Sequence, residues 1–443
     1  MSTPELTRRV LVGPELQARL RAALPWAGLG GAGIVVVAGL SIGSHKLGLP
    51  LPPFLMYWGP AVNALAAVSV VTIVGAVAVT PAIVARVRPG AVFAVSMYAL
   101  ALALGLSLNL AHEGARGWSA VFQTGRGGSV EGPYEYLTGY DALVHGIPYY
   151  LAHFAAVFPY LPLHAQGNPP GPLIALDLLG IRTAGEMAAL CIGLGALTAP
   201  LAYDLGRVLG GEQRGRVAGV LTAFSPSVLL FGVTSADYAF AALGMAAACL
   251  LVRPGVRPLI AGSIVAAIAS FFSWLLLAIP AWAAAVAVRR YGWRRAAILC
   301  CACAAALIAF NGLLALVFGY DPFSALRATA NVYYHGTWVY RPYSFWLFGS
   351  PTAWALMLGL PITWFALRAL SAGDAAAIAV WAIVAVAAVL GTTGGETERV
   401  WLPFAPLACV AASAALPAKW LRPVLCVLAL QALVVELLFF TVW

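Results

Sequence analysis

One long polar interruption in an apolar chain decides how the rest of the sequence is organised. Residues 112–171 read HEGARGWSAVFQTGRGGSVEGPYEYLTGYDALVHGIPYYLAHFAAVFPYLPLHAQGNPPG. A segment of this length between regular elements is typically either functional or disordered. Its many Tyr, Phe, Leu and Pro residues argue against disorder, which favours Ser, Lys and Glu. We therefore expect an ordered loop that carries the functional site, with the remaining chain positioning it.

The overall composition excludes a soluble globular protein. Of the 443 residues, 62% are hydrophobic and only 9% are charged, whereas roughly a quarter are charged in soluble domains. About 20 apolar residues cross a bilayer as a helix. The sequence predicts an all-α polytopic membrane protein with about 13 transmembrane helices, at 25–43, 56–84, 90–111, 183–206, 217–233, 238–252, 258–271, 272–288, 296–318, 346–367, 374–390, 400–417 and 423–441.

Two features refine this division. Residues 1–24 are polar and basic, without a small-residue cleavage site after them, so we expect a cytoplasmic N-terminal segment followed by one membrane domain over residues 25–443. The short runs on either side of Phe271–Trp274 are typical of helices that end inside the membrane, against protein or a water-filled cavity.

The distribution of basic residues predicts the orientation. With a cytoplasmic N-terminus, the outer side holds only seven of the 25 basic residues, namely Lys46, Arg116, Arg126, Arg182, Arg327, Arg341 and Arg399. Because basic residues concentrate in cytoplasmic loops, this bias places the loop at 112–182 outside the cytoplasm. A multi-pass protein of the plasma membrane is the expected setting.

Acidic residues follow the opposite pattern. Ten of the 16 acids fall on the outer side, namely Glu113, Glu131, Glu135, Asp141, Asp177, Glu186, Asp237, Asp321, Glu396 and Glu398. We expect the outer loops at 234–237, 320–343 and 392–399 to meet the 112–171 loop in one partly acidic face. Within that loop, apolar residues recur at three- and four-residue spacing from Leu143 to Leu161, with a break expected at Pro148. This pattern predicts amphipathic interfacial helices.

The motifs exclude several chemistries and leave one. The chain contains no phosphate-binding Gly-rich loop, no dinucleotide fingerprint and no G-x-S-x-G elbow. Its seven cysteines lie in apolar runs without metal-ligand spacing, as buried structural thiols do. Carboxylates and arginines on the outer face suit group transfer from a lipid phosphate, in which a carboxylate accepts a proton from a hydroxyl and a guanidinium holds the departing phosphate.

At this point the sequence resembles the GT-C superfamily, multi-spanning glycosyltransferases that use polyprenyl-phosphate sugars. The resemblance rests on Tyr134-Glu135-Tyr136-Leu137 with Asp141–Gly146, on the turn His164–Gly171 with Asn168 where His is commoner, and on Thr234–Asp237 and Gly395–Phe404, which are similar to outer-loop elements of actinobacterial members. It implies hexosyl or pentosyl transfer, such as of mannose or arabinose, from a polyprenyl-phosphate sugar to a lipid or glycan acceptor in cell-wall biogenesis. Membrane lipids are expected partners, nucleic acid is not, and a divalent cation is left open.

Three carboxylates are candidates for the catalytic base. Glu135 is favoured, with helix capping as its alternative; Glu113 could instead be a solvated charge at a helix end, and Glu131 follows a Gly-rich turn. Candidates for substrate binding are Tyr136, His164, Asn168, Asp237, Arg327, Arg341, Glu396, Glu398 and Arg399.

Several of these binding residues have structural alternatives. Asp237 could cap a helix, and Arg399 could form an ion pair with Glu398. Arg327 and Arg341 share the phosphate role. A membrane transporter or lipid flippase is the second functional hypothesis, favoured if acids lie at mid-membrane between related halves; a non-catalytic scaffold is the third.

Overall fold

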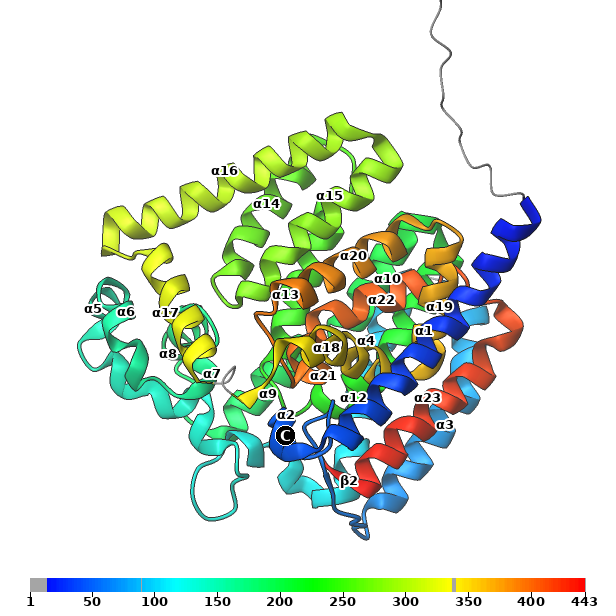
Figure 1. Cartoon of the computed structure of the whole chain (residues 1–443), viewed down its shortest axis with the longest axis horizontal. Helices are drawn as coiled ribbons and strands as arrows, with labels where there is room; N and C mark the ends of the chain where they lie inside the picture. The colour runs from blue at the N-terminus through cyan, green and yellow to red at the C-terminus, as the bar shows by residue number, and fades with distance from the viewer. Residues whose placement is uncertain (1–13, 89, 337–339, 443) are drawn as a thin grey trace, which may run out of the picture.

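The computed structural model describes residues 14–88, 90–336 and 340–442, in which helices dominate (Figure 1). Six helical stretches are long and apolar enough to cross a membrane, and a seventh is obtained if one bent pair counts as a span. They contain α1 (Pro14–Ile42), α3 (Ala66–Arg86), α4 (Gly90–Glu113), α9 (Ala184–Gly195) with α10 (Thr198–Gly210), α16 (Trp293–Phe318) and α23 (Leu421–Leu438). The protein is therefore a helical, membrane-embedded chain. The expected total of 13 spans is not confirmed.

The bent pair is α18 (Tyr343–Met357) and α19 (Leu360–Ser371), which meet at 112°. The remaining expected spans fall on shorter helices: α11 (Glu212–Phe224), α12 (Pro226–Phe231), α13 (Asp237–Leu251), α14 (Val256–Ser270), η6 (Trp274–Leu277), α15 (Ala278–Tyr291), α20 (Ala375–Leu390), η8 (Leu402–Phe404) and α22 (Ala405–Ala412). Every residue of α12 and α22 is buried. α12 and α22 therefore lie inside the bundle, where protein surrounds them, whereas α14 and α20 each keep an exposed apolar face.

The expected span at 56–84 begins too early. Its helix, α3, starts only at Ala66, and the preceding residues contain α2 (Ser44–Leu47) and β1 (Tyr57–Trp58). Prolines at 50, 52, 53 and 60 remove backbone donors from this region and explain why it is not helical. β1 pairs antiparallel with β2 (Phe439–Phe440), with Tyr57 opposite Phe440. This two-stranded ribbon departs from the all-α expectation and joins the C-terminal end of α23 to the start of α3.

Residues 112–182 are a chain of short helices. They are η1 (Gly114–Trp118), η2 (Ala120–Phe122), η3 (Gly132–Tyr134), η4 (Tyr136–Leu143), α5 (Gly146–Ala152), α6 (Phe154–Val157), η5 (Phe158–Tyr160), α7 (Leu163–Gln166) and α8 (Gly171–Leu178). The break expected at Pro148 is wrong, because this proline sits in the first turn of α5, where its missing N–H costs nothing. The interruption falls at His153 instead.

The segment packs against α17 (Pro322–His335) and the residues before it. Figure 1 shows α5 to α8 beside α17 at the left of the molecule. Buried aromatic rings make the contact: Phe154 lies 6.3 Å from Tyr320 between ring centroids, edge to face. These short helices have buried faces with Tyr150, Leu151 and Phe158, so packing of their apolar faces holds them on the bundle. Their expected position at the membrane interface stays a prediction.

A layer of ion pairs ties together the helix ends that the basic-residue count assigns to the cytoplasm. Arg216 binds Glu212 at 2.8 Å and donates to the carbonyl of Val84, and Asp204 binds Arg207 at 3.0 Å and also Arg253. The contacts connect α3, α10, α11 and the end of α13. Paired arginines therefore fix this side of the bundle.

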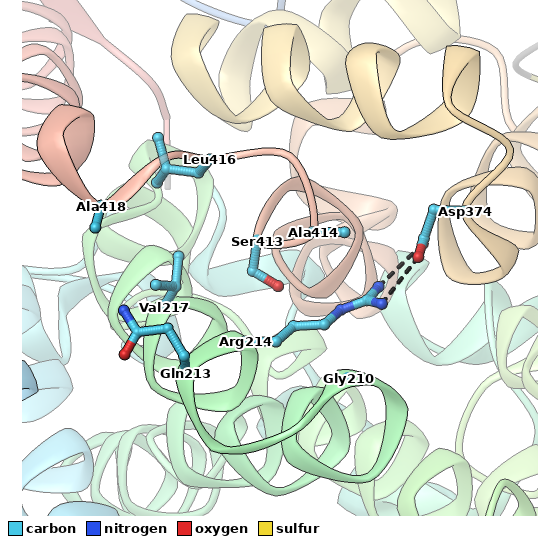
Figure 2. A pocket seen from close by; sticks show the side chains of 9 residues that line it. All are labelled: Gly210, Gln213, Arg214, Val217, Asp374, Ser413, Ala414, Leu416 and Ala418. Carbon is cyan, nitrogen blue, oxygen red and sulfur yellow. Dashed lines mark hydrogen bonds and ion pairs between the residues drawn. The ribbon is translucent and has the colours of Figure 1, made fainter.

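A pocket of about 370 Å³ lies in the same region. Figure 2 shows the guanidinium of Arg214 turned toward Asp374, with bonds of 2.8 and 3.0 Å to its two carboxylate oxygens. Asp374 Oδ1 also accepts from the first N–H groups of α20. These charges are engaged with each other and with the backbone, so we assign this pocket a structural role, in joining α11 to α20.

Candidate functional site

The central contact of the site joins two parts of the 112–171 loop. Oε1 of Glu135 lies 2.9 Å from Nδ1 of His164, and only 2% of the Glu135 side chain is exposed. Glu135 precedes η4 but makes no side-chain cap to it, so the capping alternative is not supported. A buried carboxylate held by an imidazole is a candidate acid–base pair.

The pairing changes the proton affinity of the imidazole. Burial alone would lower the pKa of His164, but the charge and hydrogen bond of Glu135 outweigh it, so the pKa is raised. Glu131 faces the other side of the ring, with its Oε2 3.8 Å from Nε2 of His164. Burial raises the pKa of Glu131 despite the nearby positive charges of His164 and Arg399. The loop thus supplies two carboxylates and one imidazole, arranged around a common centre.

Tyr136 and Asn168 connect the segment around Glu135 to the segment around His164. Nδ2 of Asn168 donates to the Tyr136 hydroxyl at 2.8 Å and to the carbonyl of His164 at 3.1 Å. Tyr136 is buried, and burial raises the pKa of its hydroxyl well above the ordinary value. The amide at position 168 therefore positions His164 relative to η4, a role that needs a donor and no titratable group.

Asp237 brings a second loop to the site. Its Oδ2 lies 2.5 Å from Nη1 of Arg399, and it accepts a 2.9 Å hydrogen bond from the hydroxyl of Ser235. The side chain does not cap α13, because the residue before the helix is Ala236 and makes no side-chain bond. The alternative in which Arg399 pairs with Glu398 is not supported: its carboxylate partners are Asp237 and Glu396.

Glu396 links the loop at 392–399 to Arg341 in the loop at 320–343. Its Oε1 lies 2.8 Å from Nη2 of Arg341 and its Oε2 lies 3.5 Å from Nη2 of Arg399. Burial acts to raise the pKa of this carboxyl, but the two guanidinium charges outweigh it and lower the pKa. Glu396 has a φ of 61°, a left-handed conformation that costs a residue other than glycine roughly 1–3 kcal/mol. Such strain persists where the surroundings fix the residue, as both arginines do here.

Glu398 lies beside this ion-pair group but is bound differently. Its Oε1 accepts a 2.6 Å hydrogen bond from the backbone N–H of Leu55. Among the residues the structure describes, Oε2 has no hydrogen-bond partner, and 1% of the residue is exposed. Burial raises the pKa of Glu398 to about 7. The residue therefore ties the segment before β1 to the 391–401 loop, and it titrates near neutral pH.

Charges from all the loops interact in one buried group. His164 and Arg399 influence each other electrostatically, and both act on Glu131. We call this group the outer cluster; its members are Glu131, Glu135, Tyr136, His164, Asn168, Asp237, Arg341, Glu396, Glu398 and Arg399. Nearly every predicted site residue belongs to it, although the loops are far apart in sequence.

Two of the predicted residues lie apart from these contacts. Glu113 is exposed at the end of α4, and its charge acts on Glu436 of α23. Arg327 is exposed on α17 and interacts with Asp321. Within the part of the chain that the structure describes, neither forms an ion pair with a member of the outer cluster, so their roles as base and phosphate ligand stay predictions.

Sequence reasoning missed two contributors. One is Ser235, whose hydroxyl donates to the carboxylate of Asp237 and accepts from its backbone N–H. Leu55 contributes through its backbone alone, which no side-chain pattern could indicate. The only local indication is the pair Pro52-Pro53 before Leu55, which breaks the helical pattern.

The residues present do not assign a metal to the site. Across residues 14–88, 90–336 and 340–442, no group of three or more His, Cys, Asp and Glu side chains is placed to hold a metal ion. The positive charges that balance the carboxylates come from Arg341, Arg399 and His164. The arrangement can accept a proton from a hydroxyl, and it can offer guanidinium groups to an anion.

Comparisons with known proteins do not assign a family. No protein-family model matches the chain, and no curated protein matches it. The function is therefore inferred from the outer cluster and from the resemblance of the loop motifs.

Proposed function

We propose that the chain is an integral-membrane glycosyltransferase that moves a sugar from a polyprenyl-phosphate donor to a cell-envelope lipid or glycan on the extracytoplasmic side. The observation that carries the proposal is the buried Glu135–His164 pair next to the arginine-containing group of Arg399, Asp237 and Glu396. It supplies a proton acceptor and guanidinium donors in one place, on a helical membrane-embedded body.

The reaction balances with these residues alone. The acceptor oxygen forms a bond to the anomeric carbon of the donor while the bond from that carbon to the phosphate oxygen breaks, and the phosphate leaves with the electron pair. The hydroxyl proton passes to Glu135, whose orientation His164 fixes through the 2.9 Å contact. Positioned general bases contribute about 10²–10⁴-fold in rate.

Arg399 and Arg341 are the proposed phosphate ligands. Each guanidinium has five N–H donors in a planar fork, so pairing with a carboxylate does not by itself exhaust its capacity. In the proposed donor complex, the carboxylates of Asp237 and Glu396 keep the forks aimed at the phosphate. Such charge-assisted bonds contribute about 1.5–3 kcal/mol each.

The test uses the full chain reconstituted in lipid nanodiscs. Radiolabelled polyprenyl-phosphate mannose and polyprenyl-phosphate arabinose are each supplied with a membrane-lipid extract, and released polyprenyl phosphate is measured. Donor-dependent release that the Glu135→Gln variant lacks supports the proposal. Binding of neither donor, with no release in any extract, contradicts it.

The transporter hypothesis has one observation in its favour. Glu436 is buried in the last turns of α23, and buried acids in membrane helices often mark ion or substrate paths. The nanodisc experiment separates the two, because a transporter would bind a lipid without cleaving the bond between sugar and phosphate.

A further inference from the structure

An apolar groove lies between α1, α19 and α23, and shares no residue with the outer cluster. Its volume is about 280 Å³, and its walls include Trp26, Trp364, Trp420, Pro361 and Pro423. The rings of Trp26 and Trp364 meet edge to face, with centroids 4.4 Å apart. Trp26 is 70% exposed and Trp420 is 51% exposed, so the groove opens outward. Figure 1 shows the three helices at the right of the molecule.

Helical spacing places three cations beyond one end of this groove, although none of them lines it. Arg368 follows Trp364 by four residues on α19 and therefore lies on the same helix face, about 6 Å further along. Arg19 precedes Trp26 by seven residues on α1, two turns away on the same face. Lys419 is the neighbour of Trp420 in η9 (Ala418–Trp420).

These three cations differ from the arginines that tie the helices of this side together. They share their exposure with other cations there, such as Arg86, Arg257 and Arg294, and are set apart by their place around the groove. Arg207, Arg214, Arg216 and Arg253 all form ion pairs. In contrast, Arg19, Arg368 and Lys419 are exposed, and none forms an ion pair among the side chains the structure describes. Neither α19 nor η9 contains an acid, and α1 carries one at position 15, four residues before Arg19, so the three cations outnumber the acids of these elements. The end of the groove is therefore positively charged.

The opposite direction along the groove is apolar. Val37 continues the Trp26 face of α1 and is 64% exposed, and Val434 continues the Val427 face of α23 and is 41% exposed. Gly30 and Gly33 on α1 have open space where a side chain would stand. A hydrocarbon chain could contact this apolar surface over its whole length. A water-soluble partner would gain little from such a contact.

We propose that this groove is a binding site for an anionic phospholipid. The acyl chains lie against the tryptophan and proline walls and continue along α1 and α23, and the headgroup phosphate lies among Arg19, Arg368 and Lys419. Charge complementarity selects the occupant, because clustered cations at a membrane boundary attract anionic lipids, and tryptophan rings concentrate at the same depth. The proposal does not depend on the glycosyltransferase function.

The experiment is a native mass spectrometry titration of the full chain in detergent. Dioleoylphosphatidylglycerol and dioleoylphosphatidylcholine are the two probes, chosen because they share acyl chains and differ in headgroup charge. We expect one phosphatidylglycerol molecule to be retained at least tenfold more tightly than phosphatidylcholine, and the triple variant Arg19→Gln, Arg368→Gln, Lys419→Gln to lose this preference.

A second triple variant controls for overall charge. Arg86→Gln, Arg257→Gln, Arg294→Gln removes the same number of exposed cations from other helix ends on the same side. Retained preference in this control and its loss in the groove variant support the site. Equal loss in both variants, or equal retention of the two lipids by the unmodified chain, overturns it.

A single substitution guards against a folding defect. Arg368→Glu changes one exposed side chain and should repel phosphatidylglycerol without altering the melting temperature measured in lipid-free detergent. An unchanged affinity in this variant also contradicts the proposal.

Discussion

Oε1 of Glu135 lies 2.9 Å from Nδ1 of His164, although four short helices, η4, α5, α6 and η5, separate the two residues in the chain. The contact joins the residue before η4 to α7 within the 112–171 loop. The charge and hydrogen bond of Glu135 raise the pKa of His164, so the imidazole depends on its carboxylate partner. Both residues must therefore be substituted to test the proposed catalytic base.

Glu135→Gln should abolish sugar transfer. Glutamine keeps the shape of the side chain and a hydrogen bond to His164, but it cannot accept the acceptor's proton, so the rate should fall by about 10²–10⁴-fold. Donor binding, measured by retention of polyprenyl-phosphate sugar, should change little. Glu113→Gln is the matched control and should keep most activity, since Glu113 is exposed away from the cluster contacts. Activity in Glu135→Gln together with its loss in Glu113→Gln would move the base to position 113.

The contribution of His164 to the stability of the protein should fall as the pH rises above about 6.5. Its folded-state pKa is raised above the ordinary value of 6.5, so protonation favours the folded state. This contribution is complete below about pH 6.5 and is lost as the pH rises through the folded-state pKa. Thermal unfolding in detergent at several pH values measures it. Glu135→Gln removes the charge that raises the pKa, so the same dependence in that variant would refute the assignment.

Glu398 should give a different pH window. Its pKa is raised from 4.5 to about 7 by burial, so the folded state binds the proton more tightly than the unfolded state does. Stability is lost between about pH 4.5 and 7 and stays lower above. Glu398→Gln, which can still accept the Leu55 N–H, should be more stable than the parent at pH 8, by up to about 3 kcal/mol.

The matched control for Glu398 is Glu186. This exposed acid completes a capping box with Thr183, and its carboxylate accepts hydrogen bonds from the backbone N–H groups of Arg182 and Thr183, so the charged form is favoured in the folded protein. Glu186→Gln should therefore change stability at pH 8 in the opposite direction. If both variants respond alike, the burial of Glu398 does not control its titration.

Arg399→Ala should impair both folding stability and donor binding. Its removal leaves Asp237 buried beside an emptied space, and breaking a buried ion pair in this way costs about 3–5 kcal/mol. Adding Asp237→Asn removes the stranded charge and should restore part of the melting temperature but none of the donor affinity. Lysine at position 399 should rescue binding only partly, because it lacks the planar fork. Full donor affinity in the double variant would show that Arg399 has only a structural role.

The orientation of the chain can be tested with a single cysteine at position 129, in a background without the seven native cysteines. Ser129 lies in the polar loop and is partly exposed. An impermeant thiol reagent should label Ser129→Cys in intact cells, whereas Arg257→Cys, at a helix end with the opposite expected orientation, should react only after the membrane is broken. The reverse pattern would place the outer cluster in the cytoplasm.

Composition and periodicity predicted the helical class and most helix positions, because long apolar runs have few alternatives in a membrane. They failed at residues 56–65, where a ribbon pairs Tyr57 with Phe440; that pairing depends on a contact between the two ends of the chain. The lengths of individual spans could not be predicted either. A short helix such as α22 is buried by neighbouring helices that its local sequence does not reveal.

The candidate site was predicted better than its internal pairing. The accumulation of acids in the outer loops indicated that Glu135, Asp237 and Glu396 would meet, and their side chains do lie in one cluster. Which arginine faces which acid was not predictable: Arg399 is next to Glu398 in sequence but binds Asp237. On a short helical turn, adjacent side chains diverge, so sequence neighbours rarely pair. Partners from distant loops take their place.

Gly171 and Phe271 hold the end of the polar loop against the helix bundle. The N–H of Gly171 donates to the carbonyl of Phe271 at 3.0 Å, and a methyl group at position 171 would stand 2.2 Å from that oxygen. The turn after His164 is thus fastened to the interruption between α14 and η6, leaving no room for even one added carbon. The polar loop is therefore fixed at this end, and an alanine at position 171 would have to displace either the turn or the backbone of Phe271.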